Sequence, residues 1–226
     1  MLKPGGTIGI LGGGQLGRML ALSAAQLGYR CIGYAPEGDN VAASVCEDFF
    51  DNRWDHTAAL AAFAAKCDVV TWEFENVPLG AVDAIPPERL FPPRRALEVA
   101  QDRLNEKRFV EELGGTPAPY MPVDTRADID QAVERIGTPG ILKTRTEGYD
   151  GKGQWRIATD RDLDALPPLM QPAIYEGLVR FEAECSVILV RSREGEVRFW
   201  DSPRNEHADG MLARSTLPAG AMIEAQ

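Results

Sequence analysis

The first third of the chain alternates short, continuous apolar runs with longer segments of helical periodicity. Residues 7–11 and 30–34 are apolar runs of strand length, and residues 15–27 between them place apolar side chains at helical spacing. Residues 56–66 are alanine-rich and helical in pattern, and residues 68–72 form a third apolar run. Because strand–helix–strand units of this kind assemble parallel sheets, we predict an α/β domain here.

Two proline pairs, Pro86-Pro87 and Pro92-Pro93, mark the end of this α/β unit. Beyond them, helical patterns cover residues 95–100, 102–113 and 128–136. The prolines therefore indicate a domain boundary near residue 93.

The second half of the chain is predicted to contain strands. Residues 140–144 and 154–157 are strand-like runs on either side of a glycine-rich segment. Residues 185–190 and 197–201 are two further strand-like runs, and the sequence of residues 193–196 between them is typical of a hairpin turn.

The first glycine motif follows the first predicted strand. Gly12-Gly13-Gly14-Gln15-Leu16-Gly17 has GxGxxG spacing and opens a predicted helix, which favours a phosphate-bearing ligand. An NAD site also needs an acidic residue at the end of the second strand, but that strand ends in Tyr34-Ala35-Pro36, and Glu37 follows the proline. Dinucleotide binding is therefore the weaker alternative, and a tight turn with no ligand is a second one.

The second glycine motif is the most informative segment. Lys143 precedes Glu147-Gly148-Tyr149-Asp150-Gly151-Lys152-Gly153-Gln154, which lacks the spacing of a Walker loop. A glycine-rich loop between two strands can close over a triphosphate, and Lys143 can reach the same phosphates. An exposed hairpin with a solvated Lys152 is the alternative.

Carboxylates and one histidine follow the second motif. A connector is predicted at Tyr175-Glu176-Gly177-Leu178-Val179, and its backbone N–H and C=O groups can form hydrogen bonds with the edge of adenine. A later carboxylate, Glu182 or Glu184, can accept hydrogen bonds from the ribose hydroxyls. Ordinary surface carboxylates are the alternative. His56 is predicted at a helix start, and His207 in a polar turn at residues 205–210.

Composition and charge narrow the class of protein. The net charge of −10 argues against nucleic acid and anionic membranes as partners. Four cysteines lie far apart without a CxxC pair, which favours reduced thiols, and two histidines are too few for a His-rich metal site. Without a signal-peptide pattern or a membrane-length apolar run, the chain is expected to be cytoplasmic.

Four segments, in this order, resemble the N5-carboxyaminoimidazole ribonucleotide synthetase (PurK) family of ATP-grasp enzymes. They are residues 12–19, Trp72-Glu73-Phe74-Glu75-Asn76-Val77-Pro78, residues 148–154, and Asn205-Glu206-His207-Ala208-Asp209-Gly210. The resemblance covers essentially all 226 residues. It implies a Rossmann-like (preATP-grasp) parallel-sheet domain at residues 1–93, a linker and small ATP-grasp lobe at 94–175, and an incomplete large lobe at 176–226.

The resemblance implies a reaction and its substrates. ATP phosphorylates bicarbonate to carboxyphosphate, and the carboxyl group passes to the amine of 5-aminoimidazole ribonucleotide, as a step of purine biosynthesis. Carboxyphosphate hydrolyses readily, so a loop that excludes water has a clear purpose.

The resemblance also implies roles for individual residues. Contacts with ATP fall on Arg103, Lys143, Gly148, Tyr149, Asp150, Gly151, Lys152, Gly153, Gln154, Glu176, Gly177, Leu178, Val179, Glu184 and His207. Contacts with the aminoimidazole ribonucleotide fall on Gly14, Gln15, Leu16, Glu73 and Asn76. Tyr149, Asp150 and Lys152, between the two substrates, are the implied catalytic residues.

The resemblance also implies that chains of the family continue beyond the position that matches Gln226. The resemblance places acidic Mg²⁺ ligands and a basic, phosphate-gripping stretch in that further part, so this chain is expected to hold no metal ligand. Because Mg²⁺ normally neutralises the ATP phosphates, we expect this polypeptide to be C-terminally truncated and inactive by itself. The intact enzyme is expected to be a homodimer.

Three rival functions remain open on the sequence. They are another ATP-grasp ligase or transferase, formate-dependent or acyl-transferring, that acts on a ribonucleotide; an NAD-dependent oxidoreductase; and a nucleotide-binding but inactive fragment.

Overall fold

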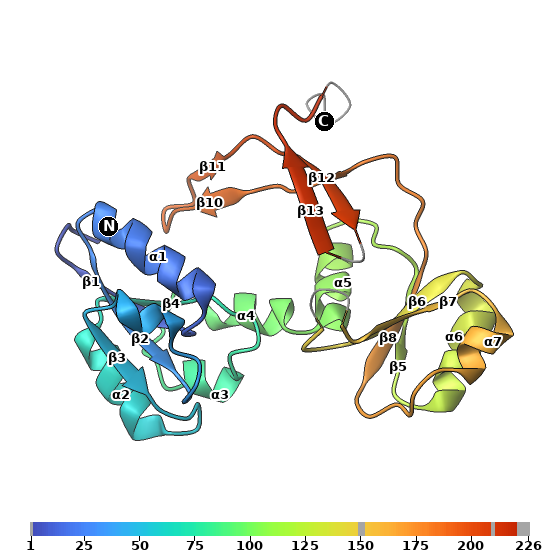
Figure 1. Cartoon of the computed structure of the whole chain (residues 1–226), viewed down its shortest axis with the longest axis horizontal. Helices are drawn as coiled ribbons and strands as arrows, with labels where there is room; N and C mark the ends of the chain where they lie inside the picture. The colour runs from blue at the N-terminus through green and yellow to red at the C-terminus, as the bar shows by residue number, and fades with distance from the viewer. Residues whose placement is uncertain (1, 149–151, 209–210, 221–226) are drawn as a thin grey trace. The chain divides into compact units, whose positions relative to one another are not determined.

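The computed structural model describes residues 2–148, 152–208 and 211–220. The chain divides into two compact units, Met1–Gly115 and Thr116–Gln226 (Figure 1). Each unit has its own sheets and its own hydrophobic core. The domain limits predicted at residues 93 and 175 stay a prediction.

The first unit is built on a four-stranded sheet in the order β3-β2-β1-β4, in which every pair is parallel. The strands are β1 (Thr7–Leu11), β2 (Arg30–Ala35), β3 (Asp48–Asp51) and β4 (Val69–Trp72). The predicted α/β class with a parallel sheet is confirmed. Strand β3 was not predicted, because its four residues carry an aspartate at each end and give no apolar run.

Helices cover both faces of this sheet. Helix α1 packs through Ala21 on the face that carries Ile10 and Cys31, and Phe63 packs on the opposite face with Leu11. This division follows from strand geometry, because neighbouring residues of a strand point to opposite faces. The helical elements are α1 (Gln15–Gln26), the 3₁₀ turn η1 (Val41–Ser44), α2 (Thr57–Lys66) and α3 (Leu79–Val82).

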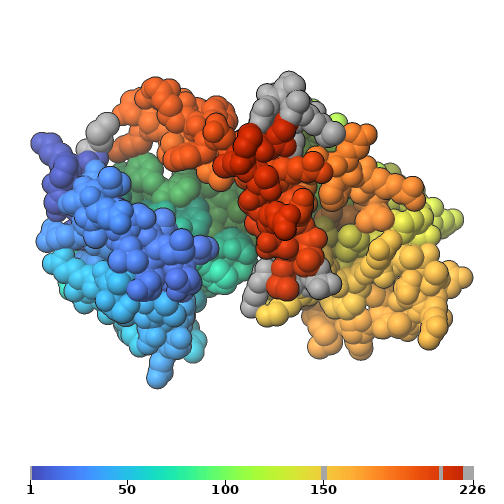
Figure 2. All heavy atoms as spheres, turned by 45° about the horizontal axis from the view of Figure 1, so that its top comes forward, coloured from blue at the N-terminus to red at the C-terminus, as the bar shows by residue number. Residues whose placement is uncertain are grey.

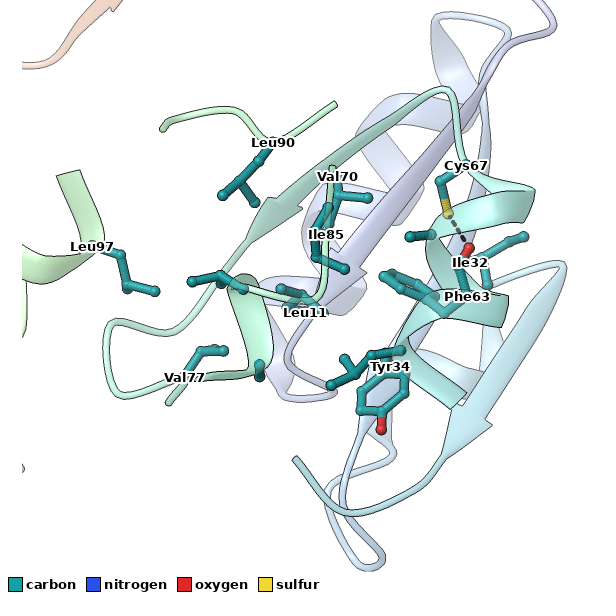
Figure 3. Packing of buried hydrophobic residues seen from close by; sticks show 14 residues of the cluster. Leu11, Ile32, Tyr34, Phe63, Cys67, Val70, Val77, Ile85, Leu90 and Leu97 are labelled. Atoms are coloured by element: carbon teal, nitrogen blue, oxygen red, sulfur yellow. Dashed lines mark hydrogen bonds between the residues drawn. The ribbon is translucent and has the colours of Figure 1, made fainter. Parts of the chain in front are cut away.

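Tyr34, near the end of β2, is the centre of an aromatic cluster, and Figure 3 shows it beside Phe63. Its ring is fully buried, with centroids 5.5 Å from both Trp54 and Phe63, and its hydroxyl donates to the carbonyl of Arg53 at 2.7 Å. The thiol of Cys67 donates to the carbonyl of Phe63 at 3.2 Å on the same side of the sheet. A dinucleotide site needs an acidic residue at the end of the second strand, whereas here the end of β2 carries the buried Tyr34, which serves packing.

Two helices, α4 (Arg94–Ala100) and α5 (Arg103–Glu112), complete the first unit. Asp102 caps α5 by accepting the backbone N–H of Leu104 at 2.8 Å. His56 caps α2 in the same way, since its Nδ1 accepts the N–H of Ala59 at 3.1 Å, which confirms its predicted place at a helix start.

The second unit contains an antiparallel sheet in the order β5-β8-β6-β7. One face packs on α6 and α7 around Leu142, Tyr175 and Ile129, and both helices begin with a Thr–Asp capping box. The elements are β5 (Tyr120–Val123), α6 (Arg126–Ile136), β6 (Gly140–Thr144), β7 (Gln154–Ile157), α7 (Asp160–Asp164) and β8 (Ala173–Gly177).

The remaining strands form a hairpin and a three-stranded sheet. Strands β10 (Leu189–Arg191) and β11 (Val197–Phe199) pair as the predicted hairpin. The three-stranded sheet has the order β13-β12-β9, from β9 (Glu184–Cys185), β12 (Arg204–Ala208) and β13 (Met211–Thr216).

Three sequence predictions in this region are wrong. Residues 185–190 do not form one strand, because β9 ends at Cys185 and β10 begins at Leu189. The predicted polar turn at 205–210 lies in β12 as far as Ala208, and Asp209 and Gly210 are outside the described residues. Tyr175 to Gly177, predicted as a connector, end strand β8. In each case pairing with another strand decides the structure, and the sequence of the segment itself does not reveal such pairing.

Within the part of the chain that the structure describes, no helix combines the length and apolar character needed to cross a bilayer.

Candidate functional site

The first glycine motif forms the turn between β1 and α1, and two carboxylates bond to its backbone. Gly13 donates its N–H to Oδ2 of Asp39 at 3.0 Å, and Gly14 donates its N–H to Oε1 of Glu73 at 3.0 Å. Glu73 follows β4 directly, and its own N–H donates to the carbonyl of Leu11 at 3.1 Å. The turn therefore lies where the carboxyl ends of β1, β2 and β4 meet, the usual ligand edge of a parallel sheet.

Gly13 is the position at which only glycine fits. A Cβ atom there would lie 1.9 Å from the backbone oxygen of Asp39. The loop after β2 thus packs directly on the turn and brings the Asp39 carboxylate with it. Sequence reasoning missed Asp39 because it looked for an acid at the end of the strand, whereas the loop returns one four residues later.

Burial raises the pKa of Glu73 above its ordinary value. The nearby charges of Asp39 and Glu75 raise this pKa further, and the hydrogen bond from Gly14 opposes the shift. Two carboxylates at one turn would repel a phosphate. The N–H groups of Gly13 and Gly14 are also already bonded, so this edge suits an amine or hydroxyl groups better than a phosphate.

The other residues predicted to contact the aminoimidazole ribonucleotide, which is the acceptor of the carboxyl group, are less closely tied to this turn. Gln15 and Leu16 begin α1 immediately after the turn, and the Leu16 side chain is exposed. Asn76 donates its Nδ2–H to Glu75 at 3.2 Å. The structure thus brings Gly14 and Glu73 together and places Gln15 and Leu16 beside them, whereas Asn76 bonds elsewhere.

A separate pocket of about 620 Å³ opens in the first unit beside Trp54 and Pro78. Pro36, Arg53, Asp55, Thr57, Gly80 and Ala81 complete its lining. None of the residues predicted to contact the acceptor lines it.

In the second unit, Lys143 on β6 and Glu176 on β8 form an ion pair. Nζ of Lys143 lies 3.1 Å from Oε2 of Glu176, and the two side chains are only 24% and 9% exposed. Ile141 is directly opposite Glu176 and Lys143 is opposite Ile174, so the pair is diagonal across two antiparallel strands. Alternation puts both side chains on the face away from Leu142 and Tyr175.

The stems of the second glycine motif are joined at Thr144. The Thr144 N–H donates to the carbonyl of Gly153 at 2.8 Å, and the Thr144 hydroxyl donates to the carbonyl of Thr146 at 2.8 Å. Gly153 has φ +66°, and a Cβ there would lie 2.7 Å from the Thr144 hydroxyl oxygen. Lys143 pairs with Gln154 across β6 and β7 at the base of the loop. The predicted residues Tyr149, Asp150 and Gly151 lie outside the described residues.

The segment that follows β8 is held by backbone hydrogen bonds. Gly177 donates to the carbonyl of Pro119 at 2.8 Å, and Leu178 donates to the carbonyl of Pro139 at 3.1 Å. Val179 follows with its side chain half exposed. Two consecutive residues of the predicted adenine-binding backbone are therefore bonded to the residues that immediately precede β5 and β6.

Glu184 and His207 meet on the three-stranded sheet. Nδ1 of His207 lies 3.2 Å from Oε1 of Glu184, and both side chains are partly exposed. Both are predicted nucleotide contacts, so the structure brings this pair together. Arg103 starts α5 in the first unit, and its predicted contact with ATP stays a prediction.

Metal ligands are not assembled in the described part of the chain. No group of three or more His, Cys, Asp or Glu side chains there is arranged to hold a metal ion. The residues described do not fit the magnesium ion that ATP chemistry uses.

Two family models match the chain. The ribonucleotide synthetase preATP-grasp domain matches residues 6–101, and the ATP-grasp domain matches residues 108–226. The second match covers more than half of the chain and includes Lys143, Glu176, Glu184 and His207.

Individual relatives are similar over nearly the whole chain. N5-carboxyaminoimidazole ribonucleotide synthase of Brucella melitensis is 46% identical over 228 residues, which cover 99% of this chain and 63% of the relative. The Staphylococcus aureus N5-carboxyaminoimidazole synthetase complexed with ADP has a TM-score of 0.91 and 33% identity, over 99% of this chain and 61% of that one. The Aspergillus clavatus synthase in complex with ADP and 5-aminoimidazole ribonucleotide has a TM-score of 0.80 and 25% identity, over 98% and 60%. The chain thus spans about three fifths of the length of these relatives.

Proposed function

The chain belongs to the N5-carboxyaminoimidazole ribonucleotide synthase (PurK) family of ATP-grasp enzymes, and from that premise we propose that the whole protein carboxylates 5-aminoimidazole ribonucleotide at the expense of ATP. The relatives complexed with ADP, and with ADP and 5-aminoimidazole ribonucleotide, support the same ligands here. We also propose a homodimer and a cytoplasmic location for the whole protein.

The observation that carries this proposal is the Lys143–Glu176 pair beside the stems of the glycine-rich loop. A cation for phosphates and a carboxylate for the adenine amino group are here held on adjacent strands. In our proposal, nucleotide entry separates the pair. The Lys143 ammonium turns to the phosphates, and the Glu176 carboxylate accepts a hydrogen bond from adenine.

The remaining nucleotide contacts follow from the same unit. Glu184 accepts the ribose hydroxyls, with His207 bonded to it. The loop at residues 148–154 covers the phosphates, and Thr144 and Gly153 hold its two stems together. Water exclusion by this loop would protect a carboxyphosphate intermediate from hydrolysis.

At the first unit we propose that the acceptor presents its polar groups to the carboxylates of the glycine turn. Glu73 and Asp39 can accept hydrogen bonds from an amine or from ribose hydroxyls. Because burial raises the pKa of Glu73, its carboxyl group takes up a proton more readily than an exposed glutamate does.

The proposed chemistry has two transfers. A bicarbonate oxygen attacks the terminal phosphorus of ATP, forming carboxyphosphate and releasing ADP. The amine nitrogen of the acceptor then forms a bond to the carboxyl carbon, the bond from that carbon to the phosphate oxygen breaks, and the amine loses one proton. Tyr149, Asp150 and Lys152 are our candidates for handling that proton, and the first two lie outside the described residues.

Carbon transfer tests the proposal directly. The longest polypeptide that the gene encodes is incubated with ATP, magnesium, 5-aminoimidazole ribonucleotide and ¹³C-bicarbonate, and the ribonucleotide is followed by carbon NMR. We expect a ¹³C carbamate signal that requires ATP. A product formed from formate in place of bicarbonate would instead support a formate-dependent ligase.

A further inference from the structure

Asn205 stands out on the three-stranded sheet. It is 8% exposed, whereas every other described residue of β9, β12 and β13 is at least partly exposed. Figure 2 shows β12 and β13 in red at the surface of the molecule. A buried amide on an otherwise exposed sheet needs hydrogen-bond partners, because leaving it unbonded is costly.

Both ends of the Asn205 amide are bonded, and to different strands. Its Nδ2 donates to the hydroxyl of Ser186 at 2.6 Å, next to the end of β9. Its Oδ1 accepts the hydroxyl of Ser215 on β13 at 2.9 Å. One side chain on the central strand therefore ties both outer strands together.

This tie shares a face with the proposed ribose site. Asn205 is directly opposite Glu184 across β12 and β9, and opposite residues of a strand pair point to the same side. His207 comes two residues later on β12 and so faces the same way, with its Nδ1 3.2 Å from Glu184. The extra residue of the irregularity between Glu206 and His207 is on β13, which leaves the alternation of β12 intact.

Backbone pairing alone holds β9 weakly. The strand has two residues, paired with β12 through Arg204↔Cys185 and Asn205↔Glu184, and a long backbone bond of 3.4 Å joins the Ser186 N–H to the carbonyl of Pro203. The shorter side-chain bond from Asn205 to Ser186, at 2.6 Å, reinforces this attachment two residues beyond Glu184.

We propose that Asn205 is a positioning residue that fixes Glu184 against His207 by bonding Ser186 and Ser215, and so prepares the ribose end of the nucleotide site. The importance of this arrangement for ATP rests on the proposed function. The arrangement itself can be tested without nucleotide.

The test compares Asn205→Ala, Ser215→Ala and Thr216→Ala in the 226-residue chain. Thr216→Ala is the matched control, because it removes a hydroxyl from the next residue of the same strand, on the opposite face. The chain has two histidines, so the imidazole signals of His207 and His56 can be followed separately by NMR. His56 lies in the first unit and serves as an internal control for folding.

We expect Asn205→Ala to move the His207 signals while His56 stays unchanged, and Ser215→Ala to move them in the same direction by less. ADP, titrated by calorimetry, should bind Asn205→Ala roughly 10-fold more weakly, as the loss of two hydrogen bonds would cause. Thr216→Ala should match the parent chain in both measurements.

Unchanged His207 signals in a folded Asn205→Ala or Ser215→Ala chain would overturn the proposal, as would an equal shift in Thr216→Ala. If Asn205→Ala does not fold, Ser215→Ala decides. If the longest polypeptide that the gene encodes binds no ADP but the His207 signals still move, the positioning role stands and the proposed function fails.

Discussion

Nζ of Lys143 lies 3.1 Å from Oε2 of Glu176, although sequence motifs assign these residues to opposite ends of a nucleotide. Both side chains are mostly shielded from water, which strengthens their attraction. Under the proposed function, a nucleotide would therefore have to replace this ion pair, and its affinity would depend on how well it does so.

Replacement of Lys143 by alanine should weaken nucleotide binding strongly. Removing a charged hydrogen bond to a phosphate is expected to lower ADP affinity about 10- to 100-fold, measured by calorimetry. Lys66→Ala is the matched control, since Lys66 also forms an ion pair, with Asp48 at 2.7 Å, but lies in the first unit on a more exposed surface. Near-normal affinity and turnover in Lys143→Ala would remove this residue from the site.

Gly13→Ala should destabilise the first unit by about 3 kcal/mol, because the new methyl group would collide with backbone rather than with a flexible side chain. Gly80→Ala is the control. Its Cβ would meet nothing within 4 Å and it lies in α3, so a change of less than about 1 kcal/mol is expected. Urea unfolding measures both, and equal effects would contradict the close packing of Asp39 on the turn.

Gly153→Ala should impair nucleotide binding more than Gly195→Ala. Both glycines have a positive φ, +66° and +89°, so both substitutions introduce backbone strain. Only the first also brings a methyl group within 2.7 Å of the Thr144 hydroxyl, at the stem of the loop. We expect at least a roughly 10-fold loss of ADP affinity for Gly153→Ala alone. Similar losses in both variants would show that strain, and not the loop stem, is responsible.

The raised pKa of Glu73 has a consequence for stability against pH. Since the folded state holds this proton more tightly than the unfolded state, wild-type stability should fall as pH rises from the ordinary glutamate pKa of 4.5 through the higher pKa of the folded state. Glu73→Gln keeps an oxygen that can accept from Gly14 but removes the charge. The free energy of unfolding of this variant, relative to wild type, should therefore increase as the pH rises from 4.5 through the raised pKa of the folded state. A constant difference across that range would contradict the shift.

One cysteine should react with a thiol reagent faster than the others. Cys185 is exposed, whereas Cys31 and Cys67 are buried, and burial raises their pKa values to about 11 and about 12. Ellman's reagent should react first at Cys185, and Cys185→Ser should abolish the fast phase. A fast phase that persists in Cys185→Ser would contradict the burial of the other thiols.

The pattern of apolar and polar residues was sufficient to predict those helices and strands that depend mainly on their own sequence. The apolar run Thr7–Leu11, the helix that starts at Gln15 and the strands around the second glycine motif were all predicted from sequence. Strand β12 was not, because Asn205 and His207 belong to a strand through partners at Glu184 and Ser215 that are distant in sequence.

The same limit applies to the site. The glycine motif and the family resemblance together pointed to Lys143, Glu176, Glu184 and His207, but could not show which of them touch. The sequence did not predict the hydrogen bond between Asp39 and Gly13, because that bond depends on a loop that folds back onto Gly13. Pairings between side chains depend on packing, and packing is a property of the fold rather than of a motif.

ADP release by the longest polypeptide that the gene encodes tests the central claim most directly. The enzyme is assayed with ATP, magnesium and bicarbonate, with and without 5-aminoimidazole ribonucleotide. We predict that release depends on the ribonucleotide and is largely lost in Lys143→Ala. Release that ignores the ribonucleotide, from a folded protein that binds ADP, would contradict the assigned acceptor.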